Sequence, residues 1–201
     1  MIDDFGARVA SIWSELQPTT RRLVERALKS PPSTPKPARN LPYDALAETE
    51  LSRLLAALDD RDAETTQSPG RNQDLRHVAD TCANVLQERT QSADVFAQLV
   101  KRAERQHDYA RIDSLANELA RFAPSEICEL SRSSEIVIRA LADEALAQFP
   151  TGVLISLLND PIDSEMARHA LRRQALEFGS EEARQILVFL AQADVAEEEF
   201  Q

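Results

Sequence analysis

The sequence predicts an all-α protein, with stacked antiparallel helix pairs preceded by an N-terminal helical arm. Its 201 residues include only 4 glycines and 5% aromatic residues, whereas 29 alanines and 24 leucines make up about a quarter of the chain. This composition favours helix over sheet. Apolar residues recur at helical spacing along most of the chain, and a helix–turn–helix pattern repeats in its second half.

Residues 1–30 form the predicted arm. Pro18 is expected to end or kink its first helix, and Thr19 or Thr20 is expected to cap a second one. The apolar face of the first helix either packs on the body of the same chain or docks on another chain, and the sequence leaves both arrangements open. The residues of this face, separated by three or four positions, are Ile2, Phe5, Val9, Ile12 and Leu16.

A proline-rich linker, residues 31–42, separates the arm from the body. It holds five of the ten prolines, so a helix cannot cross it and the segment should be extended. Residues 1–42 carry 7 basic and 4 acidic side chains, whereas residues 43–201 carry 16 basic and 30 acidic side chains. A mildly basic arm therefore precedes a strongly acidic body.

The body, residues 43–201, is predicted to be helical. A first helix covers Tyr43 to Leu58, and the stretch from Asp59 to Asn72 is predicted to be a polar loop. Helices and short turns then alternate, with Ser and Asp suited to helix N-caps and proline suited to a first helical turn. The predicted turn and cap positions are Ser92, Asp108, Pro124, Ser133, Ser134, Pro150, Asp160, Pro161, Gly179 and Ser180.

Three consecutive stretches align as copies of one helix–turn–helix unit, and a weaker copy precedes them at Leu75 to Ala103. The copies run from Asp108 to Arg132, from Ser134 to Asp160 and from Ser164 to Gln192. A helix pair cannot bury its apolar face alone, so we expect the pairs to stack around one interior. The phenylalanines expected to fill equivalent niches are Phe122, Phe149 and Phe178. An irregular helical bundle is the alternative.

The stretch from Leu157 to Leu176 resembles a HEAT-like repeat, a family with leucines, an Asp-Pro turn, and then Arg, Ala and Leu at helical spacing. The corresponding residues are Leu157, Leu158, Asp160, Pro161, Arg168, Ala170, Leu171, Ala175 and Leu176. Residues 138–146 resemble the same element, but the first copy lacks the Asp-Pro turn and the repeats are shorter than common HEAT units. The resemblance covers residues 108–196 and implies an α-solenoid that holds other macromolecules.

Several classes of protein are not expected from this sequence. The first four residues begin neither a basic segment nor a long apolar one, so no signal peptide is predicted. The longest apolar run, Ile186 to Ala191, is six residues long, and a membrane span needs about 20. Cys82 and Cys128 are too few for a disulfide framework, and we expect both to be reduced and buried in a cytoplasmic protein.

The sequence predicts no catalytic, cofactor-binding or metal-binding residues. His77 and Cys82 are five positions apart, which does not match the i, i+4 spacing of a helical metal pair. His107 and His169 are predicted to be surface residues. Neither a glycine-rich phosphate loop nor a nucleophile elbow is present.

Candidate partner-binding residues lie in the arm and in the one arginine cluster of the acidic body. The basic arm is expected to dock on an acidic surface, and its tryptophan is either core or an interface anchor. The clustered arginines either bind a carboxylate or phosphate group or pair internally with acids such as Glu165 or Asp163. These candidates are Ile12, Trp13, Arg22, Arg26, Arg168, Arg172 and Arg173.

The expected function is that of a non-enzymatic protein–protein interaction module or scaffold with an acidic helical-repeat surface. Its partner is expected to be a basic protein, bound in a salt-sensitive way, rather than nucleic acid or a membrane. Self-association through the arm is also left open. The alternatives are an enzyme or enzyme accessory on a HEAT-like scaffold and an acidic immunity or antitoxin-like inhibitor of a basic target.

Overall fold

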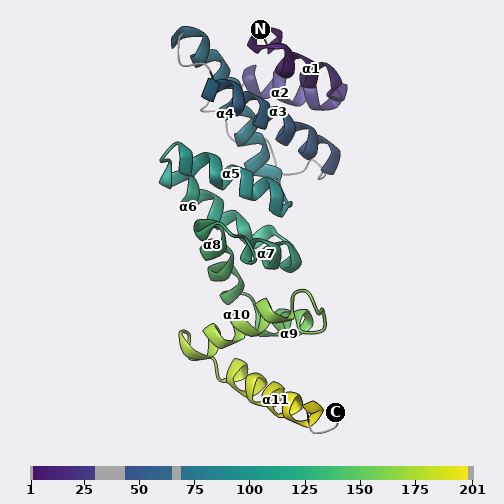
Figure 1. Cartoon of the computed structure of the whole chain (residues 1–201), viewed down its shortest axis with the longest axis vertical. Helices are drawn as coiled ribbons and strands as arrows, with labels where there is room; N and C mark the ends of the chain where they lie inside the picture. Colours follow the sequence, from purple (N-terminus) through teal and green to yellow (C-terminus); the bar gives the residue numbers. More distant parts are fainter. Residues whose placement is uncertain (1, 30–43, 65–68, 199–201) are drawn as a thin grey trace. The chain divides into compact units, whose positions relative to one another are not determined.

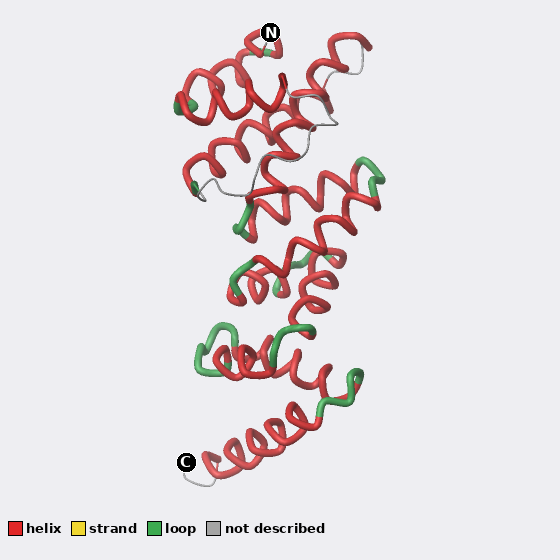
Figure 2. The backbone as a smooth tube through the Cα atoms, turned by 180° about the vertical axis from the view of Figure 1, so that it is seen from behind, coloured by secondary structure: helices red, strands yellow, loops and turns green. Residues whose placement is uncertain are grey.

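The computed structural model describes residues 2–29, 44–64 and 69–198, and the regular structure in these ranges is helix without any strand (Figures 1 and 2). The all-α prediction is confirmed, whereas the predicted linker lies outside the described residues. The helices are η1 (Ile2–Phe5), α1 (Ala7–Glu15), α2 (Pro18–Lys29), α3 (Ala45–Glu64), α4 (Pro69–Arg89), α5 (Ala93–Arg105), α6 (Tyr109–Glu118), η2 (Leu119–Arg121), α7 (Pro124–Ser131), α8 (Ile136–Ala147), α9 (Thr151–Leu157), α10 (Ser164–Leu176) and α11 (Glu181–Glu198).

The chain divides into two compact units. The first contains the residues up to Thr90 together with Asp94–Leu99, and the second contains Gln91–Ala93 and the chain from Val100 onward. Helix α5 therefore contributes to both. In the first unit the Gln98 side chain donates a hydrogen bond to the backbone of α3 at 3.1 Å, and in the second unit Lys101 forms an ion pair at 3.2 Å with the turn before α8.

The arm helices pack on their own chain within the first unit. Helix α1 contacts α3, and α2 contacts both α3 and α4. Four of the five residues of the predicted apolar face are buried, and Ile12 is half-buried. Val24 of α2 is fully buried. Of the two arrangements that the sequence left open, this apolar face adopts the one in which it covers the body of the same chain.

The prediction of one continuous first helix in the arm is wrong, because the helix is interrupted at Gly6. This residue has a φ of +119°, a conformation that favours glycine, and it separates η1 from α1. Helix α1 ends at Glu15, before Pro18 as predicted, and Pro18 is the first residue of α2. Thr19 and Thr20 lie inside α2, so neither is its N-cap.

The predicted polar loop from Asp59 to Asn72 is wrong at both ends, because α3 continues to Glu64 and α4 begins at Pro69. The polar residues of this stretch are compatible with helix, and two of them are tied to neighbouring helices by ion pairs. These pairs join Arg8 to Asp60 at 2.8 Å and Arg76 to Asp62 at 2.9 Å. High polarity here marks an exposed helical surface.

The three stretches predicted as helix–turn–helix copies lie in the second unit. The first comprises α6, η2 and α7, the second comprises α8 and α9, and the third comprises α10 and α11. Helix α8 contacts both η2 and α10, and α7 contacts α9. Contacts also join α7 to α8, α9 to α10 and α10 to α11. Consecutive helices therefore pack against one another in pairs.

The three phenylalanines precede the second helix of each pair, but the prediction that they occupy equivalent niches is wrong. Phe122 is buried, Phe149 is half-buried and Phe178 is 57% exposed. Phe178 lies in the turn between α10 and α11, and no described helix follows α11 along the chain.

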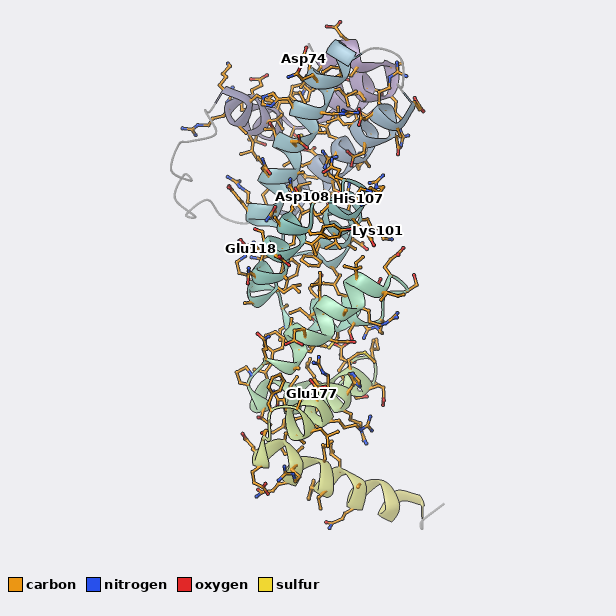
Figure 3. All side chains as sticks on the ribbon, turned by 90° about the vertical axis from the view of Figure 1, so that its left-hand side faces the viewer. Asp74, Lys101, His107, Asp108, Glu118 and Glu177 are labelled. Atoms are coloured by element: carbon orange, nitrogen blue, oxygen red, sulfur yellow. The ribbon has the colours of Figure 1, made fainter. Side chains whose placement is uncertain are left out.

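The predicted turns of the second unit fall between helices. Asp108 is the N-cap of α6 and accepts a backbone amide of its first turn at 3.0 Å; it lies next to His107 (Figure 3). Pro124 occupies the first position of α7. The placement predicted for Pro161 is wrong, since it lies in the turn before α10, which begins at Ser164, rather than in a first helical turn.

Candidate protein-binding surface

The arm candidates lie on two helices of the first unit. Ile12 and Trp13 are half-buried on α1, whereas Arg22 and Arg26 are exposed on α2. Part of the Trp13 side chain therefore remains accessible to a partner. Ile12 lies at a shallow hollow between α1 and α3, whose lining residues are Arg8, Ser11, Ile12, Arg53 and Ala56.

Two residues of the arginine cluster form ion pairs within the second unit. Arg172 lies 3.7 Å from Glu165 on the same helix. Arg173 bridges two helices, because it pairs with Glu177 at 2.6 Å and with Glu144 of α8 at 2.9 Å. The third candidate, Arg168, is half-buried on α10.

The electrostatics of Arg173 are those of a structural ion pair. Hydrogen bonds from Arg173 hold the pKa of Glu144 and the pKa of Glu177 below their ordinary value, and the same hydrogen bonds raise the pKa of the guanidinium. Glu177 lies near the end of α10 (Figure 3). Arg173, Glu144 and Glu177 thus connect α8 to α10. Internal pairing with acidic residues was one of the two alternatives that the sequence left open for these arginines.

Exposed isoleucines that were not among the sequence candidates lie at the first residue of α8 and in the turn before α10. Ile136 is 74% exposed and Ile162 is 69% exposed. The backbone of Ile162 is fixed on both sides: its amide donates to Asp160 Oδ1 at 2.8 Å, and its carbonyl accepts from Arg132 at 3.2 Å. Arg132 precedes α8 and also pairs with Asp163 at 2.8 Å, so the turns before α8 and α10 are joined.

Acidic residues accompany these isoleucines. Glu135 directly precedes Ile136 and pairs with Lys101 at 3.2 Å, and Asp160 is exposed two positions before Ile162. We refer to Ile136, Ile162, Glu135 and Asp160 as the apolar–acidic edge. An equivalent combination opens α6, where Asp108 precedes the exposed Tyr109.

No family model, curated protein or solved structure matches this chain. The function proposed below therefore rests on the surfaces of the chain itself. Among the described helices, none has the length and hydropathy needed to cross a membrane.

The last helix, α11, also exposes apolar side chains. Ala183 is buried, and Ile186, Leu187 and Leu190 are half-buried. Val188 and Phe189, on the other side of the helix, are 54% and 70% exposed. The sequence already indicated exposed apolar residues in this helix. Six consecutive apolar residues are distributed around all sides of a helix, whereas one neighbouring helix can bury only one side.

The described residues contain no group of three or more His, Cys, Asp or Glu side chains that could hold a metal ion. Cys82 and Cys128 are buried, as predicted, and neither belongs to a disulfide. Burial, with a contribution from nearby Asp163, raises the pKa of the Cys128 thiol to about 11, so it stays protonated at neutral pH. The three histidines are exposed, at His77, His107 and His169.

Proposed function

We propose that this chain is a non-enzymatic interaction module that binds a basic segment of another protein across the apolar–acidic edge. The observation that carries the proposal is the high exposure of Ile136, at the start of α8, and of Ile162, in a turn that is held by hydrogen bonds and joined to Arg132. Large apolar side chains on a fixed backbone lose little freedom on binding, which suits them as anchors for a partner.

The energetics indicate a partner of moderate affinity. Burying each isoleucine side chain contributes about 2 kcal/mol. Association costs at least about 4 kcal/mol in lost translational and rotational freedom, so the two anchors alone do not produce stable binding. Further contacts with the acidic surroundings must supply the rest, and we infer that the partner combines apolar and basic side chains.

The charge of the body supports a basic partner. Residues 43–201 carry 30 acidic and 16 basic side chains, so a cationic segment is attracted before contact and its association is weakened by salt. Arg22 and Arg26, which are exposed on α2, are proposed as a second contact, for acidic groups of a partner. The burial of both cysteines as thiols rather than as a disulfide supports a reducing, cytoplasmic location.

The repeat interpretation also supports a binding role. The first helices α8 and α10 contact each other in the second unit, and so do the second helices α7 and α9, as in an α-solenoid. The resemblance of residues 157–176 to a HEAT-like repeat implies a family that holds other macromolecules. We therefore infer that the second unit is a short HEAT-like solenoid whose binding edge lies at the start of α8 and in the turn before α10.

Affinity capture with matched variants tests this function. The immobilised wild-type chain should retain a basic protein at low salt and release it at high salt. The double variant Ile136→Asp/Ile162→Asp should lose that protein, whereas Leu46→Asp, at an exposed leucine of the first unit, should keep it. With the purified partner, calorimetry should show binding at least about tenfold weaker for the double variant. Equal retention by all three chains, or capture of acidic proteins alone, would contradict the proposal.

A further inference from the structure

One side of α11 lacks a neighbouring helix within the described part of the second unit. The main contacts of α11 are with α10, on the side that carries Ala183, and Figures 1 and 2 show no other helix of the second unit against the opposite side. A helix that is apolar on all sides is normally buried on all sides. Helix α11 is not covered in this way at Val188 and Phe189, which are 54% and 70% exposed.

The residues of this outer face form a symmetric pattern. Gln185, Val188, Phe189 and Gln192 are all exposed, and their spacing of i, i+3, i+4 and i+7 places them in one stripe on the helix. The stripe reads glutamine, apolar, apolar, glutamine in either direction. Its centre lies between Val188 and Phe189.

We propose that two copies of this chain associate through this stripe, with their α11 helices antiparallel about a two-fold axis between Val188 and Phe189. A two-fold interface uses the same patch on both copies, so the patch must be complementary to itself. In this arrangement each Phe189 packs on the partner copy's Val188, and each Gln185 faces the partner copy's Gln192. A glutamine amide both donates and accepts hydrogen bonds, so these two residues can pair in either direction.

Charge favours a second copy over the basic partner proposed for the apolar–acidic edge. The eight residues from Gln185 to Gln192 carry no charge, in a chain of which 28% of residues are charged. A cationic segment therefore gains no ion pair within this stripe, and two acidic copies meet no charged side chain there that would repel its counterpart. The interface is independent of the proposed partner-binding edge.

The contact is small, because each copy contributes one helix face. Interfaces of this size are weak and form at high protein concentration. Exposed Leu176 and Phe178, which precede α11, increase the apolar surface at the start of the helix. The expected species is a reversible dimer.

Sedimentation equilibrium of the full chain tests the dimer. The mass should rise with concentration from 22.4 kDa toward twice that value. Phe189→Lys should weaken association at least about tenfold, because it places a charge at the centre of the interface. Leu46→Lys, at an exposed leucine of α3 in the first unit, should leave association unchanged. Far-ultraviolet circular dichroism confirms that each variant stays folded.

A charge swap tests the antiparallel register. Gln185→Lys/Gln192→Glu places opposite charges face to face across the two-fold axis and should associate more tightly than Gln185→Lys/Gln192→Lys. The second variant has the smaller net negative charge, so a general charge effect would produce the reverse order. A mass that stays at one copy at every concentration, association that Phe189→Lys does not change, or equal association of the two charge variants would each overturn the proposal.

Discussion

Glu50 of α3 and Thr20 of α2 are joined by a buried hydrogen bond in which the Thr20 hydroxyl donates to the carboxylate at 2.5 Å. The same carboxylate accepts the backbone amide of Gln17, at 3.1 Å and 3.2 Å to its two oxygens. Glu50 thus caps the start of α2 from another helix, where a negative charge is favourable. This contact ties the arm to the body of the chain.

Replacing Glu50 should destabilise the first unit. Glu50→Ala removes the cap and leaves a buried hydroxyl without its acceptor, which costs about 2 kcal/mol in the free energy of unfolding. Urea denaturation followed by the fluorescence of Trp13, the only tryptophan, reports on this unit. Glu25→Ala, at an exposed glutamate of α2, is the control, with an expected change below about 0.5 kcal/mol. Equal effects of the two substitutions would show that the contact is not stabilising.

The sequence is informative where structure is set by neighbours along the chain. Helix periodicity, the Asp108 cap and the first-turn position of Pro124 depend on a few adjacent residues, and these predictions are confirmed. The cap that Glu50 provides lies 33 positions from Gln17 in sequence, so no local pattern indicates it. The polar loop predicted after Leu58 failed because polarity alone does not distinguish a loop from an exposed helix surface.

The candidate surface was less predictable than the fold. The exposure of Ile136 depends on which helices cover it, and this is decided by packing between elements distant in sequence. Arg173 was named as a candidate for binding a partner, and its pairing with Glu144 across 29 positions appears only in three dimensions. The apolar stretch of α11 was visible in the sequence, but which side of it is exposed requires the position of α10.

Gln174 should be a stabilising residue of the second unit. Its buried side-chain amide, on α10, donates to the carbonyls of Ala147 at 3.1 Å and Phe149 at 2.6 Å, where α8 ends. Gln174→Met keeps the shape but leaves two carbonyls unpaired, so the free energy of unfolding should fall by about 2–3 kcal/mol. Gln148→Met, at an exposed glutamine, should change it by less than about 0.5 kcal/mol. Urea denaturation followed by circular dichroism compares the two, and similar values would contradict this role.

His107 should be a position where glycine stabilises the chain. Its φ is +54°, in the left-handed region, and the Asp108 amide closes the end of α5 by donating to the Ala103 carbonyl at 2.9 Å. Gly179, with a φ of +67°, has the equivalent place after α10. His107→Gly should raise the melting temperature, with a gain of up to about 1 kcal/mol, and His107→Val should lower it. A lower melting temperature for the glycine variant would contradict the expected strain.

Both cysteines should be unreactive in the folded protein. Cys82 and Cys128 are buried, and the raised pKa of Cys128, about 11, keeps its thiol protonated. Since the thiolate is the reactive form, a thiol reagent at pH 8 should modify neither cysteine until the chain unfolds, and both should react in urea. Rapid modification of one thiol in native conditions, located by mass spectrometry, would show that its helix opens locally.

The ion pairs of Arg173 should make stability depend on pH in acid. The pKa values of Glu144 and Glu177 are lower in the folded chain than their ordinary value of 4.5, so the unfolded chain binds protons more readily. These ion pairs therefore contribute fully to the free energy of unfolding above pH 4.5. Their contribution is lost as the pH falls through the lowered pKa values of the two glutamates. In Arg173→Met, the decrease in stability below pH 4.5 should be shallower than in the wild type, as measured by urea denaturation at a series of pH values.

Arg172→Met is the matched control, because Arg172 contacts neither glutamate in this group, and its profile should follow that of the wild type. Parallel profiles for all three chains would show that these ion pairs are screened by solvent and do not couple protonation to folding.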